Sequence, residues 1–201
     1  MEGQRLIKTH LPYSLLPQED ILKKNVKIFY IMRNPKDVAV SYYHFVRMMT
    51  ISNYSGSFDN FLEDFMSDKV PYGPIWKHYQ EMWDHKDEQN ILILFYEDLQ
   101  KDIRGSIRKI AGFLNRNLTE REISEIADHC SFDNMSQNPN VNYQHWDALG
   151  IRKSSEAKFM RKGQVGDWKN YFNSAMNHSM DIWIENNFRD ISVSFAYENL
   201  K

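Results

Sequence analysis

Two polar residues eight positions apart, Arg33 and Ser41, have side chains suited to binding one anion, the guanidinium as a two-pronged donor. Arg33 directly follows residues 26–32, an apolar run of β-branched and aromatic residues that predicts a buried strand. Asn34 is a good helix N-cap and Pro35 suits the first helical position, so a helix should begin there. Arg33 then lies at the carboxyl end of a strand, where ligands bind in open α/β sheets. This stretch alone is equally compatible with an ordinary surface arginine and an ordinary helical serine.

Two further groups of residues could also do chemistry. Arg161, Lys162 and Gly163 combine two cations with a backbone N–H that no Cβ obstructs, a pattern suited to phosphate, although a bare Arg-Lys pair is more often solvated surface charge. His10 follows residues 5–9, which read as a short strand. A histidine there could act as a general base because its ordinary pKa lies near neutrality. For a lone histidine, a structural role remains the more common alternative.

The elements that must position these residues follow from hydrophobic periodicity and caps. The run ILILF at 91–95 is the least ambiguous strand. Residues 138–158 lack periodicity, and a loop of this length in a compact domain is usually functional or disordered. Residues 13–24 form a polar connection and 195–201 a tail. A helix is expected from 35 to about 49, with Val38, Tyr42 and Phe45 on one face, and a second at 58–66 with Ser57 as its cap. A third should begin after Pro74, with Trp76, Tyr79 and Trp83 as a stripe that faces the core. Further helices are expected at 102–114, 120–129 and 174–186, of which the 120–129 helix begins with a capping box at Thr119–Glu122.

Composition restricts the class of protein. The 201 residues, 42% hydrophobic and 14% aromatic, are typical of one globular domain, which we assign to 1–201. A net charge of −2 argues against a nucleic-acid or anionic-membrane partner. The single Cys130 excludes an internal disulfide and suits a reducing compartment. No apolar run reaches the ~18 residues of a membrane span. We therefore expect a cytoplasmic protein, and no ligand spacing indicates a metal.

Four separated motifs resemble the cytosolic sulfotransferases that use PAPS as sulfuryl donor. They are KTHLP at 8–12, RNPKDVAVSYYHF at 33–45, FYEDL at 95–99 and RKGxxGDWKN at 161–170, the last matching through Phe172. The resemblance covers nearly the whole chain and is specific for the family, less so for any subfamily. It implies an α/β fold, a three-layer parallel sheet of the P-loop nucleotide-kinase-like type, of which this chain is the carboxyl-terminal two-thirds.

The resemblance also implies an activity and a set of roles. A sulfuryl group would pass from PAPS to a hydroxyl or amine of a small phenolic, steroid-like or xenobiotic acceptor, leaving PAP. The implied roles are general base for His10 with Lys8 beside it; 3′-phosphate binding for Arg33, Ser41, Arg161, Lys162 and Gly163; adenine contact for Tyr96, Phe132 and Phe159; and shaping of the acceptor pocket for Phe45 and the 138–158 lid.

Two departures from the family pattern carry their own expectations. The family's amino-terminal phosphosulfate-binding loop is absent from the 201 residues, so we expect the chain alone to transfer sulfate poorly. The family's dimer motif aligns with Lys169, Asn173, Ser174 and His178, of which only the lysine matches. We therefore expect the family-type homodimer to be weak.

Two other classes stay open. One is a non-catalytic, PAP-binding fragment or splice form of such an enzyme. The other is a P-loop kinase of similar fold, which is disfavoured because none of the eight glycines belongs to a G-x-x-x-x-G-K-[ST] loop.

Overall fold

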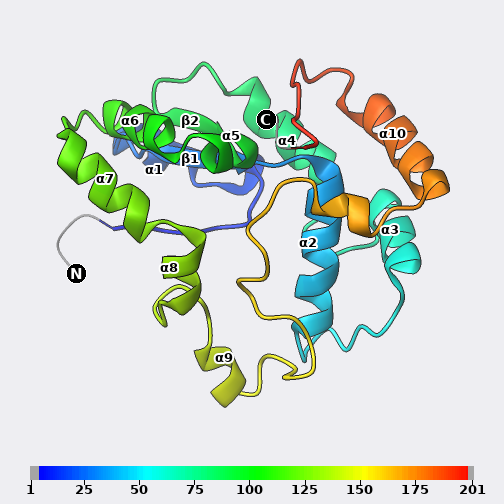
Figure 1. Ribbon diagram of the computed structural model, residues 1–201. Helices are drawn as coiled ribbons and strands as arrows, with labels where there is room; N and C mark the ends of the chain where they lie inside the picture. Colours follow the sequence, from blue (N-terminus) through cyan, green and yellow to red (C-terminus); the bar gives the residue numbers. More distant parts are fainter. Residues whose placement is uncertain (1–4, 199–201) are drawn as a thin grey trace.

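A computed structural model describes residues 5–198 and centres on a parallel pair of strands (Figure 1). Strands β1 (Ile28–Met32) and β2 (Ile91–Phe95) pair in register from Ile28 opposite Ile91 to Met32 opposite Phe95. β1 begins two residues later than predicted, and β2 has the predicted bounds. The carboxyl ends of both strands therefore meet at one edge, and the chain leaves each strand directly into a helix.

Helices cover both faces of this sheet, giving three layers. On one face, Tyr79 and Met82 of α4 (Ile75–Asp84) and Phe188 of α10 (Ser174–Phe188) pack in a core cluster with Met32 and Ile91. On the other face, Phe113 of α6 (Ile103–Phe113) meets Phe29 edge-on at 5.2 Å between ring centroids. The predicted α/β fold with a parallel sheet is confirmed, and the aromatic stripe of α4 belongs to the core as predicted.

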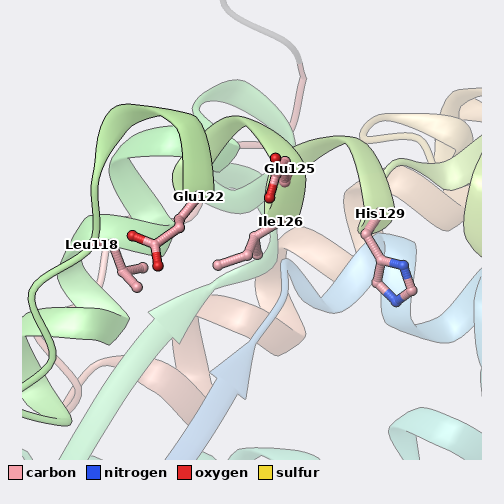
Figure 2. Close-up of a pocket in the computed structure, with 5 residues that line it drawn as sticks. All are labelled: Leu118, Glu122, Glu125, Ile126 and His129. Carbon is pink, nitrogen blue, oxygen red and sulfur yellow. The ribbon is translucent and has the colours of Figure 1, made fainter.

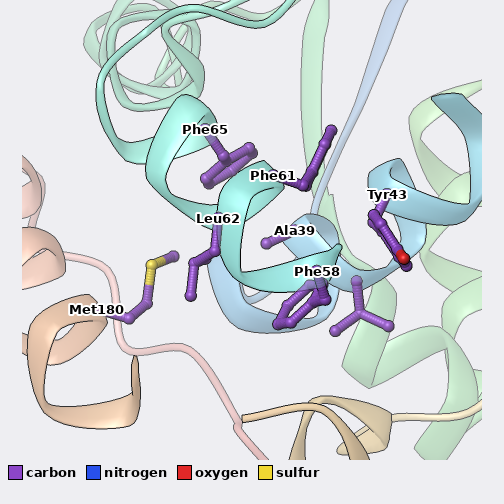
Figure 3. Packing of buried hydrophobic residues seen from close by; sticks show 8 residues of the cluster. Ala39, Tyr43, Phe58, Phe61, Leu62, Phe65 and Met180 are labelled. Carbon is purple, nitrogen blue, oxygen red and sulfur yellow. The ribbon is translucent and has the colours of Figure 1, made fainter. Parts of the chain in front are cut away.

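A second hydrophobic core joins α2 (Pro35–Met48), α3 (Phe58–Met66) and α10 (Figure 3). The predicted face of α2 was only partly right. Val38 and Tyr42 pack against this core but stay partly exposed, whereas Ala39, Val40 and Tyr43 are buried. The buried members are Ala39, Val40, Tyr43, Phe58, Phe61, Leu62, Phe65 and Met180.

The predicted helix caps form as expected. The Asn34 side chain accepts a hydrogen bond from the Asp37 N–H at the start of α2, and Ser57 accepts one from the Asn60 N–H at the start of α3. Thr119 and Glu122 close a reciprocal capping box at α7 (Glu120–His129). These caps satisfy N–H groups that the first helical turn leaves without a partner.

The prediction of a strand at 5–9 is wrong. This segment is extended but pairs with no strand in the described part of the chain, and Leu6 and Ile7 are 96% and 79% exposed. Sequence reasoning also missed several short helices: η1 (Tyr13–Leu15), α1 (Gln18–Lys23), α5 (Tyr96–Lys101), α8 (Phe132–Gln137), α9 (His145–Ala148) and η2 (Asp167–Asn170). Across residues 5–198, no helix is long and apolar enough to cross a membrane.

Truncating Phe61 to alanine should lower the free energy of unfolding by about 3–5 kcal/mol, because Phe61 is 1% exposed and its removal leaves a cavity in the second core. Urea unfolding followed by tryptophan fluorescence measures the change. Leu22→Ala is the control, since Leu22 is 68% exposed and should shift the midpoint little. Equal effects of the two changes would contradict the assignment of this core.

Candidate active site

The sheet register places Arg33 and Tyr96 side by side at the carboxyl ends of β1 and β2. Each follows the last residue of its strand, and the Arg33 guanidinium lies 4.2 Å from the centre of the Tyr96 ring. Tyr79 of α4 fixes the Arg33 backbone: its hydroxyl donates to the Arg33 carbonyl at 2.9 Å and accepts from the Arg33 N–H at 3.0 Å. Arg33 is therefore held at the strand end by its backbone and by an aromatic face.

The turn after Arg33 is buried and contains polar side chains. The carboxylate of Glu97, in the first turn of α5, accepts hydrogen bonds from the Asn34 N–H at 2.7 Å and from Asn34 Nδ2 at 3.0 Å. Burial raises the pKa of Glu97, while these hydrogen bonds and the charge of Arg33 act in the opposite direction. Asn34 and Glu97 thus tie the first turns of α2 and α5 together beneath Arg33.

Asp37 joins this turn to the distant segment 161–168. Its carboxylate accepts hydrogen bonds from the Gly166 N–H at 2.7 Å and the Trp168 N–H at 3.0 Å. In addition, Arg33 Nη2 donates to the carbonyl of Gln164 at 2.8 Å. The two motifs with predicted phosphate-binding residues are therefore neighbours in space, as their resemblance to one family requires.

Arg161 and Lys162 both pair with Asp167. Arg161 Nη2 lies 2.6 Å from one carboxylate oxygen and Lys162 Nζ 2.6 Å from the other, which also accepts from Asn170. Burial alone would raise the pKa of Asp167, but hydrogen bonds from Lys162, Asn170 and Arg161 outweigh it and hold the pKa at about 2.

Arg161 also lies near His44, and the side chain of Tyr171 contacts both. Its guanidinium faces the Tyr171 ring at 5.9 Å, and the Tyr171 hydroxyl lies 2.7 Å from His44 Nε2. Burial and the charge of Arg161 lower the pKa of His44 to about 4, with a smaller contribution from Arg47. His44 is consequently neutral at physiological pH and serves as an uncharged neighbour of the cation.

Gly163 has a φ of +63°, and the ring of Phe132 packs against it so closely that an added Cβ would lie 2.2 Å from Phe132 Cδ2. A side chain at this position would meet both strain and a clash. The pairing of Gly163 with Phe132 brings a predicted phosphate contact next to a predicted adenine contact.

Other predicted residues are not drawn into this group. Ser41 lies on an exposed face of α2, and no hydrogen bond joins it to Arg33 within the described part of the chain. Phe45 is partly buried beside Tyr42, with ring centroids 6.2 Å apart. Phe159 packs on Tyr143 of the lid, at 4.4 Å. Their predicted roles remain predictions.

The predicted base lies beside Tyr72, in the segment that precedes α4. The His10 ring centroid is 5.2 Å from that of Tyr72, and burial lowers the His10 pKa with help from the charges of Lys8 and His78. Lys8 lies over the ring of Tyr143, at 5.8 Å, so the amino-terminal segment lies beside the 138–158 segment. The sequence did not single out His78, whose Nδ1 is hydrogen-bonded to the Tyr30 hydroxyl at 2.7 Å.

The lid is anchored at the end of α2 and is not a free loop. The Thr50 N–H donates to the Ile151 carbonyl at 2.9 Å, and the Lys153 N–H donates to the Met48 carbonyl at 2.8 Å. An ion pair of 2.7 Å joins Arg47 to Glu156. The expected lid segment is therefore fixed at its carboxyl-terminal half.

Of two pockets in the described part of the chain, only one borders the predicted site, at Gly163. One, on the outer side of α7, is lined by Glu122, Glu125 and His129 with two apolar residues, and none of the predicted site residues borders it (Figure 2). The other, of about 410 Å³, lies between α5, residues 163–165 and the 196–198 segment. Within residues 5–198, no group of three or more His, Cys, Asp or Glu side chains could hold a metal ion.

Comparisons with known proteins now define the class. A family model described as "Sulfotransferase domain" matches residues 1–192. Sulfotransferase 1B1 of Canis lupus familiaris is 41% identical over 194 residues, covering 96% of this chain and 65% of the relative. Human sulfotransferase 1E1 is 42% identical over 199 residues, covering 98% and 67%. The chain belongs to the sulfotransferase family and spans about two thirds of the length of the curated relatives it matches.

Solved structures agree on the fold. Retinol dehydratase in complex with androsterone and the inactive cofactor PAP superposes with a TM-score of 0.89 at 36% identity, covering 96% of this chain and 55% of that chain. Mouse sulfotransferase SULT7A1 complexed with PAP gives 0.82 at 34%, covering 95% and 68%. The predicted family and fold are confirmed.

The depressed pKa of Asp167 predicts a pH-dependent contribution to stability. Because its pKa falls from 3.8 in the unfolded chain to about 2 when folded, its stabilisation is complete above about pH 5 and is lost as the pH drops towards 2. The difference in unfolding free energy between the wild type and Asp167→Asn should therefore shrink from pH 5 to pH 3, by about 1 kcal/mol. Denaturant titrations at each pH measure it, and a constant difference would contradict the ion pairs described.

Proposed function

We propose that the protein is a sulfotransferase that moves a sulfuryl group from PAPS to a hydroxyl or amine of a small acceptor. The observation that carries this proposal is the meeting of two distant motifs at the carboxyl ends of the strands. Burial raises the pKa of the Tyr96 phenol above its ordinary value, while the charges of both Arg33 and Arg161 act in the opposite direction. Two relatives of the same fold were crystallised with PAP.

Arg33, Arg161, Lys162 and Gly163 would hold the 3′-phosphate of the nucleotide. The fit is supported by an unused donor, since Arg33 Nε is buried and has no hydrogen-bond partner among residues 5–198. It is also supported by the positive φ of Gly163, a backbone conformation that a residue with a side chain could not adopt here without strain and a clash with Phe132. Ser41 would add a hydroxyl, and Tyr96, Phe132 and Phe159 would contact the adenine.

His10 would act as general base towards the acceptor. As the acceptor oxygen or nitrogen bonds to sulfur, the bond from sulfur to the bridging phosphate oxygen breaks, and His10 accepts the acceptor's proton. The lowered pKa of His10 suits this role because it keeps the imidazole unprotonated at neutral pH. Lys8, Phe45 and the lid would border the acceptor.

Arg33→Ala should weaken PAP binding by about 10- to 150-fold, the loss of a charge-assisted hydrogen bond worth about 1.5–3 kcal/mol. Isothermal calorimetry on the 201-residue chain measures the affinity. Arg121→Ala is the matched control, since the Arg121 side chain is 88% exposed on α7. Unchanged PAP affinity in Arg33→Ala would remove Arg33 from the proposed site.

In a longer chain that also carries the family's phosphosulfate-binding loop, His10→Ala should lower the rate of phenol sulfation at saturating PAPS by about 10²–10⁴-fold while PAP affinity changes little. In the wild type, kcat/KM should fall only below pH 6.5, because the His10 pKa lies below that ordinary value. Near-normal turnover in the variant would show a structural histidine. Tight PAP binding by the wild type without any turnover would instead indicate the non-catalytic, PAP-binding alternative.

A further inference from the structure

The carboxylate of Asp37 is the only side-chain acceptor that, within residues 5–198, bonds backbone N–H groups of Gly166 and Trp168. It is 1% exposed, and both of its oxygens are used: Oδ1 accepts from Trp168, and Oδ2 accepts from Gly166 and from Asn34 Nδ2 at 2.9 Å. Because the donors include two backbone groups, these bonds set the path of the main chain.

The two anchored residues, Gly166 and Trp168, lie within five residues of Gly163, the last of the proposed phosphate ligands in this segment. Gly166 and Trp168 come three and five residues after Gly163, and Gly166 itself has a φ of +86°. A main chain fixed at 166 and 168 limits where the N–H of Gly163 and the two cationic side chains can lie.

Asp37 also restrains Arg33. Its Oδ2 lies 3.6 Å from Arg33 Nη2, whose side chain is 18% exposed, and the same Nη2 donates to the Gln164 carbonyl. At 3.6 Å this is an ion pair without a direct hydrogen bond, so it orients the guanidinium and leaves donors for an anion.

We propose that Asp37 is a positioning residue for 3′-phosphate recognition: it fixes residues 161–168 against Arg33 so that their donors converge before the nucleotide arrives. This inference rests on the function proposed above and adds a residue that touches neither phosphate nor adenine. Pre-organised donors bind an anion more tightly because less ordering accompanies binding.

Asp37→Asn tests the inference with almost no change in volume. The amide keeps one acceptor oxygen but turns an N–H donor towards backbone N–H groups and removes the charge opposite Arg33. We expect the preference for PAP over adenosine 5′-phosphate, which lacks the 3′-phosphate, to fall by about tenfold or more, while the affinity for adenosine 5′-phosphate changes less than about threefold. Asp59→Asn, with an exposed side chain on α3, is the matched control and should preserve the preference.

The possible results are distinguishable. A wild type that binds both nucleotides equally would reject the proposed phosphate site itself, and the positioning role with it. A wild type that prefers PAP, together with an Asp37→Asn variant that keeps this preference, would overturn the positioning role alone. Equal weakening of both nucleotides would also overturn it, because that is the result of general destabilisation.

Amide hydrogen exchange on the wild type provides a second measurement, which decides the matter if Asp37→Asn does not fold. The amides of Gly166 and Trp168 should be protected in the free protein, and PAP should add little to their protection, because Asp37 already holds them. Fast exchange without nucleotide, becoming slow only with PAP, would overturn pre-organisation by Asp37.

Discussion

The in-register parallel pairing of β1 and β2 is the constraint on which the candidate site depends. Met32 opposes Phe95, so the next residue of each chain, Arg33 and Tyr96, must be neighbours. The helices that follow begin at the same level, which is why Asn34 can donate two hydrogen bonds to the Glu97 carboxylate. A slip of one residue would turn every side chain of a strand to the opposite face and separate these pairs.

Below that edge, the site depends on buried polar groups that are hydrogen-bonded to one another, although Glu97 Oε2 has no partner among residues 5–198. Asn34, Asp37 and Glu97 are at most 5% exposed, and hydrogen bonds between them and to backbone N–H groups replace water. A buried polar group without a partner would cost several kcal/mol. Such a network fixes one geometry, because shifting any member leaves another unsatisfied.

Local sequence signals predicted much of the fold. Asn34-Pro35, Ser57 and the Thr119–Glu122 box mark helix starts because each cap involves residues close in sequence. The prediction of a strand at 5–9 was wrong for the opposite reason. A strand needs a neighbouring strand to pair with, and a local run of residues does not indicate which segment that is. Short helices such as α1 and α5 lack the length over which periodicity becomes visible.

The candidate site was predictable only in part. The motifs identified Arg33 and Arg161–Gly163, but nothing in the local pattern indicated that Asp37 would bond residues 129 and 131 positions away. One signal was available, since Asp37 is a charge in the first turn of an apolar helix, four residues after Arg33. Asp167 likewise reads as a solvated surface acid until the fold buries it beside two cations.

Helix α2 connects the two ends of the proposed site as a single rigid body. Its first turn carries Asp37, and its last residues hold the lid through Met48 and Arg47. Its 14 residues span about 21 Å. The part of the 138–158 segment before residue 150 lies outside these anchors, so its sequence can diverge while the helix and the proposed phosphate ligands stay unchanged. Under the function proposed above, the architecture separates two evolutionary pressures: acceptor choice can drift in an exposed loop while recognition of a shared nucleotide is preserved in the buried turn.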